Sequence, residues 1–271
     1  MTAQEKLDVK LKQGKHICVG LDTDISKIPM YLHSEDSPIL KFNKIIIDNT
    51  ESYAAAYKIN FAFYEKDGAA GVEILKQTIK YIPEDILIIG DAKRGDIGNT
   101  SEMYAYSLYS QFMVDAATLS PYMGFDSVEP FLRHGDKINF ILALTSNKSA
   151  ADFEKLELKE GGYLYQKIIT MVTGWNKLNN CGIVFGATNT EELRTNVELF
   201  KDLYVLLPGI GAQGGSLNEV TDIFKKQKFY KFIINISRSL IYKDKTKEFG
   251  KKAREEIENL NNTVNGILSI Y

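Results

Sequence analysis

Eight short apolar runs recur along the chain, and longer amphipathic stretches separate them. The runs are rich in Val, Ile and aromatic residues and cover residues 16–22, 54–63, 85–93, 116–121, 139–145, 181–188, 203–211 and 232–239. The stretches between them, such as GVEILKQTIKYI and SLNEVTDIFKKQ, resemble helices. Continuous apolar strands that alternate with helices predict a parallel sheet covered on both faces.

These strand–helix units predict a single α/β domain built as a (β/α)8 TIM barrel, because such a barrel needs eight of them in about 250 residues. The prediction covers residues 1–271, with a short helix before the first strand. No linker rich in Pro, Gly or Ser and no low-complexity segment divides the chain. An open, doubly wound parallel sheet is the structural alternative for the same rhythm.

Polar residues gather where the apolar runs end. Asp22 follows the first run, Lys58 and Asn60 lie in the second, and Asp91 and Lys93 close the third. The fifth, seventh and eighth runs add Thr145, Ser146, the segment PGIGAQGG and Arg238. In a barrel the carboxyl ends of all strands meet on one face, where such barrels carry out their chemistry. We therefore expect an active site built from six of the strands.

The segment PGIGAQGG, which starts at Pro208, predicts a phosphate site. It contains the spacing G-x-G-x-x-G, formed by Gly209, Gly211 and Gly214. This spacing alone is a weak sign of dinucleotide binding, and no acidic residue closes the next strand, where a ribose-binding carboxylate belongs. That strand ends in Ser237 and Arg238 instead. Glycine backbone N–H groups and an arginine fork fit a phosphate monoester, and Gln213 in the loop is a further candidate ligand.

Composition and charge exclude several other classes of protein. Hydrophobic residues make up 44% of the chain and charged residues 25%, and the net charge is −2, with no basic stripe for nucleic acid. No apolar run approaches the ~18 residues of a membrane span, and the charged N-terminus lacks the apolar core of a secretory signal. Cys18 and Cys181 lie in apolar runs and are predicted to be buried thiols. We expect a protein of a reducing compartment, the cytoplasm.

The sequence GDAKRGDIGNT, residues 90–100, places Asp91 and Lys93 at the end of a buried strand. A surface ion pair in an exposed loop would contribute only about 0–1 kcal/mol, but the position at a strand end favours a role in the site. Side chains two residues apart on a strand point the same way, so both are expected to face the barrel mouth beside Lys58. Neighbouring carboxylates keep a lysine charged, and a charged lysine is suited to stabilise and protonate a developing carbanion.

This array needs neither a metal ion nor an organic cofactor. The three histidines, His16, His33 and His134, lack the spacing of metal ligands. No motif for flavin, nicotinamide or pyridoxal phosphate is found. We therefore expect no metal and no cofactor, with a charged lysine as the sink for negative charge.

The pattern Asp91-x-Lys93-x-x-Asp96-Ile97, followed by Thr100, resembles the signature of the orotidine 5′-phosphate decarboxylase family. The resemblance extends along nearly the whole chain, in family order, through VGLD, YKIN, PGIGAQGG and SRS. The form KIN and the chain length are similar to the longer, type 2-like branch of the family. The resemblance implies cofactor-free decarboxylation of orotidine 5′-monophosphate to UMP, the last step of de novo UMP synthesis, by a homodimer with sites at its interface.

The resemblance also implies a role for each matching residue. The charged array would consist of Lys58, Asp91, Lys93 and Asp96, and Lys93 would deliver the proton to C6. The partner subunit would supply Asp96, Ile97 and Thr100. The substrate-binding set would be Asp22 and Asn60 at the ribose, Thr145 or Ser146 at the pyrimidine, and Pro208, Gln213, Ser237 and Arg238 at the phosphate. The sequence leaves open whether the chain is fused to the orotate phosphoribosyltransferase of the preceding step or forms a complex with it.

Two other functions stay open for the same residues. Mg²⁺-dependent sugar-phosphate decarboxylases or aldolases of the same barrel group share the Asp-x-Lys-x-x-Asp strand end. They need a further carboxylate ligand, for which Glu51 and Glu65 are candidates, and Lys58 and Asn60 argue against them. A non-catalytic nucleotide-binding barrel would keep Arg238 and the glycines but would have no need of the charged array.

Overall fold

Eight parallel strands close into a barrel in the computed structural model, which describes residues 1–211 and 214–268. The strands are β1 (Ile17–Gly20), β2 (Ala56–Asn60), β3 (Leu87–Arg94), β4 (Ala116–Leu119), β5 (Ile138–Leu144), β6 (Cys181–Phe185), β7 (Tyr204–Pro208) and β8 (Phe232–Ile236). Each strand pairs with its neighbour in sequence, and β1 pairs with β8 in parallel, which closes the ring. The barrel prediction is confirmed, and the open sheet is excluded because a closed ring has no edge strand.

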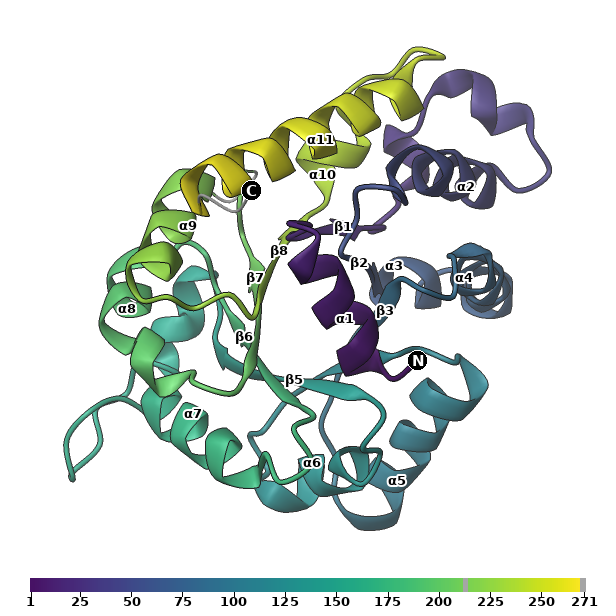
Figure 1. The fold of residues 1–271 in the computed structure, drawn as a ribbon. Helices are drawn as coiled ribbons and strands as arrows, with labels where there is room; N and C mark the ends of the chain where they lie inside the picture. The colour runs from purple at the N-terminus through teal and green to yellow at the C-terminus, as the bar shows by residue number, and fades with distance from the viewer. Residues whose placement is uncertain (212–213, 269–271) are drawn as a thin grey trace.

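Helices surround the barrel on all sides (Figure 1). The helices are α1 (Ala3–Lys12), α2 (Pro38–Thr50), α3 (Ala62–Glu65), α4 (Gly68–Tyr81), α5 (Gly98–Tyr106), α6 (Phe125–Leu132), α7 (Leu164–Trp175), α8 (Thr190–Asn196), α9 (Leu217–Lys226), α10 (Arg238–Ile241) and α11 (Phe249–Leu268). In α9 the buried positions Val220, Ile223 and Phe224 recur at helical spacing, so one stripe faces the sheet. Ser216 caps its start by accepting a hydrogen bond from the Glu219 N–H.

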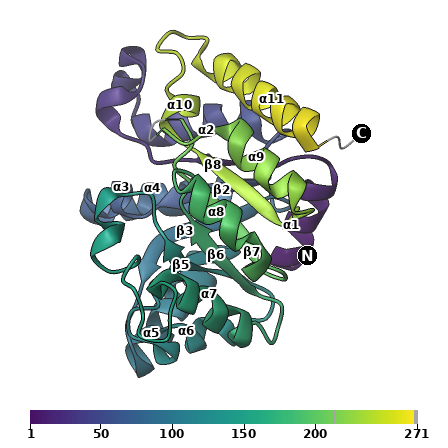
Figure 2. The ribbon, with the colours of Figure 1, turned by 90° about the vertical axis from the view of Figure 1, so that its left-hand side faces the viewer.

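The first helix, α1, forms the floor of the barrel. It lies across the middle of the ring in Figure 1 and at one end of the barrel in Figure 2. Its buried Ala3 and Leu7 belong to the same apolar cluster as Leu87, the first residue of β3. Lys6 also pairs with Asp115 just before β4, at 2.8 Å. Because α1 covers the amino ends of the strands, only their carboxyl ends are left for a site.

Most of the strands are shorter than the apolar runs that predicted them. The seventh run reaches residue 211, but β7 ends at Pro208 because Gly209 and Gly211 have φ values of +105° and +76°. Such angles belong to the left-handed region, which glycine enters without steric strain, and they turn the chain away from the sheet. Within the described ranges, no helix is long and apolar enough to cross a membrane.

Candidate active site

A cavity of about 300 Å³ opens at the carboxyl ends of the strands. Residues in or directly after all eight strands line it, two more strands than expected. The lining consists of Asp22, Lys58, Asn60, Asp91, Lys93, Thr118, Leu142, Thr145, Ser146, Asn147, Val184, Leu206, Pro208, Gly209, Ile210, Asn235, Ser237, Arg238 and Ser239. The volume is at the lower end of the range for small-molecule sites.

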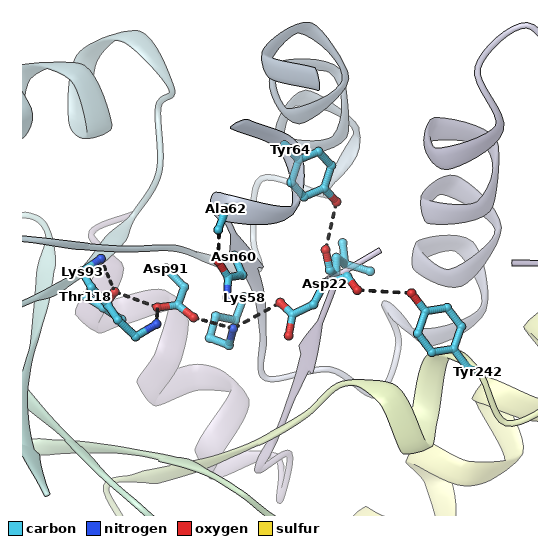
Figure 3. A network of polar contacts seen from close by, with 10 residues as sticks. Asp22, Lys58, Asn60, Ala62, Tyr64, Asp91, Lys93, Thr118 and Tyr242 are labelled. Atoms are coloured by element: carbon cyan, nitrogen blue, oxygen red, sulfur yellow. Dashed lines mark hydrogen bonds and ion pairs between the residues drawn. The ribbon is translucent and has the colours of Figure 1, made fainter. Parts of the chain in front are cut away.

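Four charged side chains form an alternating row along one wall of this cavity (Figure 3). Lys58 Nζ lies 3.4 Å from Asp22 Oδ1 and 2.8 Å from Asp91 Oδ2. Lys93 Nζ lies 2.6 Å from the other oxygen of Asp91, Oδ1. The order acid, base, acid, base places opposite charges next to each other throughout. The sequence analysis expected Lys58, Asp91 and Lys93 to meet at the barrel mouth, but its fourth member of the array was Asp96 and not Asp22.

Burial and charge act in opposite directions on the two inner members of the row. Burial lowers the pKa of Lys58, but the carboxylates of Asp91 and Asp22 outweigh it, so the pKa is raised above its ordinary value. Burial raises the pKa of Asp91, but the ammonium groups of Lys58 and Lys93 outweigh it, so the pKa is lowered. Both groups therefore stay ionised at neutral pH, and the side chain of Asp91 cannot serve as a proton donor.

Lys93 differs from its neighbours in exposure and in backbone geometry. Its side chain is 49% exposed, whereas that of Lys58 is 6% exposed. Its φ is +46°, in the left-handed region, which costs an L-residue about 1–2 kcal/mol. The register of β3 against β4 also shifts between Gly90 and Arg94, so the end of β3 is a bulge. The contact between Lys93 and Asp91, which was expected from regular alternation of side chains, thus forms at an irregular strand end.

Thr118, on β4, is a residue of the site that the sequence analysis missed. Its hydroxyl donates to Asp91 Oδ1 at 2.9 Å and accepts from the Lys93 backbone N–H at 3.0 Å (Figure 3). The side chain is almost fully buried, with 1% exposure. The only signal in the sequence was a threonine near the middle of the apolar run 116–121, which also contains Ser120.

Two tyrosines hold the segment that carries Asp22. The Tyr64 hydroxyl donates to the Leu21 carbonyl at 2.9 Å, and the Tyr242 hydroxyl donates to the Asp22 carbonyl at 3.2 Å (Figure 3). The Asp24 N–H in turn donates to the Tyr242 oxygen at 2.7 Å. These tyrosines were not predicted as part of the site, because nothing in their local sequence distinguishes them from packing residues.

Asn60 and Thr145 make contacts that their sequence positions did not reveal. Asn60 Oδ1 accepts from the Ala62 N–H at 3.1 Å, at the start of α3. The Glu154 carboxylate accepts from the Thr145 N–H at 2.6 Å and from its hydroxyl at 2.9 Å. The Thr145 hydroxyl also lies 2.6 Å from Asn147 Oδ1, so it already has acceptors within its own loop.

Residues that were predicted to bind phosphate line the cavity from the ends of β7 and β8. Pro208 and Gly209 line it from β7, and Ser237 and Arg238 line it from the end of β8. Arg238 is exposed and forms no ion pair with any carboxylate in residues 1–211 or 214–268. Gln213 lies outside the described residues. A guanidinium without a carboxylate partner, beside glycine N–H groups, suits a phosphate.

Two buried oxygens at the end of β8 lack partners among the described residues. Asn235 Oδ1 and Ser237 Oγ have no hydrogen-bond partner among the residues that the structure describes. A buried polar group without a partner costs about 1–3 kcal/mol, so a bound ligand or water is expected to contact both. Asn235 was not predicted, although it lies three residues before Arg238 in the eighth run.

The three residues assigned to the partner subunit lie apart from this cavity. None of Asp96, Ile97 and Thr100 is among its lining residues. The Asp96 carboxylate accepts a hydrogen bond from the Ile97 N–H at 2.8 Å, and within the described ranges it forms no ion pair. Ile97 is 54% exposed. In one chain by itself Ile97 and Thr100 are therefore exposed and Asp96 is half-buried.

The described part of the chain contains no cluster of three or more His, Cys, Asp or Glu side chains placed to hold a metal ion. The two glutamates considered as Mg²⁺ ligands do not line the cavity. Glu51 is the C-cap of α2, and Glu65 pairs with Arg94 at 2.7 Å. Cys18 and Cys181 are buried free thiols, as predicted.

Comparison with known sequences gives consistent results over almost the full length of the chain. The profile of the family described as Orotidine 5'-phosphate decarboxylase / HUMPS matches residues 15–253. The orotidine 5'-phosphate decarboxylase of Porphyromonas gingivalis is 46% identical over 259 residues, which cover 94% of each chain. The protein of the same name from Christiangramia forsetii is 45% identical over 265 residues, which cover 97% of each chain.

Solved structures of similar proteins agree with this result. The OMP decarboxylase of Leishmania donovani matches with a TM-score of 0.81 and 33% identity, over 97% of this chain and 99% of that chain. The UMP synthase of the same organism matches with a TM-score of 0.86 and 35% identity, over 99% of this chain but only 57% of that chain.

Proposed function

The chain belongs to the orotidine 5′-phosphate decarboxylase / HUMPS family, and we propose that it is a carboxy-lyase that converts orotidine 5′-monophosphate to UMP and CO₂ without a metal or cofactor. The row Asp22–Lys58–Asp91–Lys93 carries this proposal. It provides a cation where negative charge develops and a fixed carboxylate that holds the cation in place. Curated relatives at 45–46% identity that bear the decarboxylase name support the same branch of the family.

In the proposed reaction the bond between C6 and the carboxyl carbon breaks and its electron pair stays on C6. No adjacent π system absorbs that pair well, so the transition state carries negative charge at C6. The Lys93 ammonium meets this charge without reorganising, and it then transfers a proton from Nζ to C6. Asp91 lies beside the substrate carboxylate, where two like charges ~4 Å apart repel by about 4 kcal/mol at an effective dielectric of ~20. That repulsion ends as neutral CO₂ leaves.

The other parts of the nucleotide are assigned to the remaining residues that line the cavity. Asp22 and Asn60 bind ribose hydroxyls, and Ser146 contacts the pyrimidine edge. Arg238 and Gln213 hold the phosphate together with Pro208, Ser237 and the glycine loop. The bound phosphate contributes binding free energy at a distance from the reacting carbon, which helps to order the loops around the substrate.

Removal of the arginine tests the phosphate assignment. Arg238→Ala is expected to raise the KM for orotidine 5′-monophosphate by about 10- to 100-fold, because charge-assisted hydrogen bonds of about 1.5–3 kcal/mol are lost. The affinity for uridine, which has no phosphate, should be unchanged. Steady-state kinetics measures the KM, and titration calorimetry with UMP and uridine measures the two affinities. Arg133→Ala, which removes a surface arginine paired with Glu129, is the control. Equal weakening of UMP and uridine by Arg238→Ala would contradict the assignment.

A second copy of the chain completes the proposed site. Exposed apolar side chains lie at and along α5, where Ile97 is 54%, Met103 59% and Tyr106 54% exposed. Packing of this face against a partner would remove apolar surface from water. It would also bring Asp96 and Thr100 of one subunit to the cavity of the other. We therefore include a homodimer with shared sites in the proposal.

The decisive assay is the ultraviolet absorbance change on conversion of orotidine 5′-monophosphate to UMP in buffer that contains EDTA. Full activity is expected, because Lys93 takes the role that a metal ion has in the Mg²⁺-dependent enzymes of this barrel group. The parallel control replaces EDTA with Mg²⁺. Activity that disappears in EDTA and returns with Mg²⁺ would favour the metal-dependent branch, and no absorbance change in either buffer would favour a non-catalytic barrel.

The surroundings of the enzyme in the cell are also part of the proposal. Two buried free thiols fit a reducing compartment such as the cytoplasm. A complex with orotate phosphoribosyltransferase stays a prediction. The Leishmania UMP synthase supports it only by analogy, because this chain matches little more than half of that protein.

A further inference from the structure

Thr118 connects the two residues on which the proposed chemistry depends. It lies on β4, directly beside the end of β3, and its side chain is buried. Its hydroxyl oxygen accepts from the backbone N–H of Lys93, and its hydroxyl proton goes to Oδ1 of Asp91. One small side chain therefore holds both the main chain of the proton donor and the carboxylate that positions the donor (Figure 3).

The direction of these two bonds is fixed. A hydroxyl has a single proton, and the Lys93 N–H can only donate, so the Thr118 proton is available for Asp91. Asp91 Oδ1 then accepts from both Thr118 and the Lys93 ammonium, while Oδ2 accepts from Lys58. Both carboxylate oxygens are occupied by donors, so the carboxylate is held in one orientation.

The backbone of Lys93 needs such a partner. Its φ of +46° is unfavourable for a side-chain-bearing residue, and the bulge interrupts the pairing of β3 with β4 between Gly90 and Arg94. The Lys93 N–H finds its acceptor in Thr118 at 3.0 Å instead. Without this acceptor, Lys93 would lose the hydrogen bond that offsets the cost of its positive φ. Its half-exposed side chain could then turn toward solvent.

We propose that Thr118 is a positioning residue for decarboxylation, which holds the bulge so that the Lys93 ammonium stays on Asp91 and faces the reacting carbon. The proposal rests on the proposed function, and it adds a residue on β4 to the site. Thr118 touches the two charged residues and acts on the reaction through them. Its hydroxyl, and not its methyl group, carries the effect.

The test compares Thr118→Val, which keeps the shape and removes the hydroxyl, with Thr118→Ser, which keeps the hydroxyl. Thr118→Val is expected to lower kcat by about 100-fold, the effect of a misplacement of about 1 Å in a catalytic group. The KM and the affinity for UMP should change by less than about threefold, because Arg238 and the ribose contacts are untouched. Thr118→Ser should stay within about threefold of the parent in kcat.

Thr221→Val is the matched control, since Thr221 is equally buried but lies on α9, where its hydroxyl donates to the Leu217 carbonyl. It should leave kcat unchanged. The parent enzyme is assayed first: an inactive parent refutes the proposed function, whereas an active parent with an equally active Thr118→Val refutes only the role of Thr118. If Thr118→Val does not fold, a large loss of kcat in folded Thr118→Ser, with its hydroxyl retained, also overturns the proposal.

Discussion

Lys93→Ala is expected to lower kcat by at least about 10⁴-fold while the affinity for UMP changes by less than about tenfold. The substitution removes the only cation of the row that is exposed enough to meet the substrate, since the Lys58 side chain is 6% exposed and held between two carboxylates. It removes both the charge that stabilises the carbanion and the proton that the carbanion receives, and a charge placed in advance at the reacting atom is a large part of catalysis. The absorbance assay gives kcat, and calorimetry with UMP gives the affinity.

Lys66→Ala is a suitable control for this experiment. Lys66 also pairs with an aspartate at 2.8 Å, and its side chain is 48% exposed, against 49% for Lys93. Loss of a surface pair of this kind changes stability by about 0–1 kcal/mol and should not alter turnover. If Lys93→Ala retained most of the parent kcat, the electrostatic account of the reaction would be wrong.

A mixed dimer should restore activity to two inactive proteins. Asp96→Ala is expected to lower kcat by at least about 10³-fold, because it removes the carboxylate proposed to reach Lys93 from the other subunit. When Lys93→Ala and Asp96→Ala chains are co-expressed with different tags, the purified mixed dimer has one site with both native residues. It should therefore show about half of the parent activity per dimer, as two-fold symmetry requires.

The negative control for the mixed dimer combines Lys93→Ala with Lys58→Ala. Both lysines belong to the same chain in the proposed site, so each site of that mixed dimer lacks one of them and activity should not return. If the Lys93/Asp96 pair also failed to restore activity, Asp96 would act within its own subunit. An Asp96→Ala protein that kept the parent kcat would show that Asp96 has no role in the reaction. Gel filtration of the parent protein tests the dimer itself, and elution as a monomer would contradict the shared site.

The sequence was sufficient to predict the barrel and the row of charges, because both depend on short-range patterns. Apolar runs mark strands wherever both faces of a sheet are buried. The carboxyl ends of those strands must share one face, so Asp22, Lys58 and Asp91 could be placed together before any coordinates were known. Lys93 was placed with them on the assumption that side chains alternate regularly along β3, and the irregular end of β3 does not keep this alternation.

The features that could not be predicted depend on contacts between distant segments. Lysine has no special preference for positive φ, so the bulge at Lys93 leaves no mark in its own sequence. Thr118 and Tyr242 reach the site through hydrogen bonds to residues 25 or more positions away. Glu154 contacts Thr145 across a segment that holds only a short 3-10 helix, Lys148–Asp152, and is too short to show helical or strand periodicity. The proposed role of Asp96 involves a second copy of the chain, whose contacts one sequence does not describe.

The helix that forms the floor, α1, has a practical consequence for engineering this enzyme. Its contacts, such as Leu7 in the apolar cluster and the ion pair of Lys6 with Asp115, lie at the opposite end of the barrel from the cavity. Barrels of this kind separate the residues that confer stability from those that perform chemistry. We therefore expect directed evolution for heat resistance to accumulate changes in α1 without a loss of turnover. Changes at the strained end of β3, which carries Lys93, are expected to lower turnover.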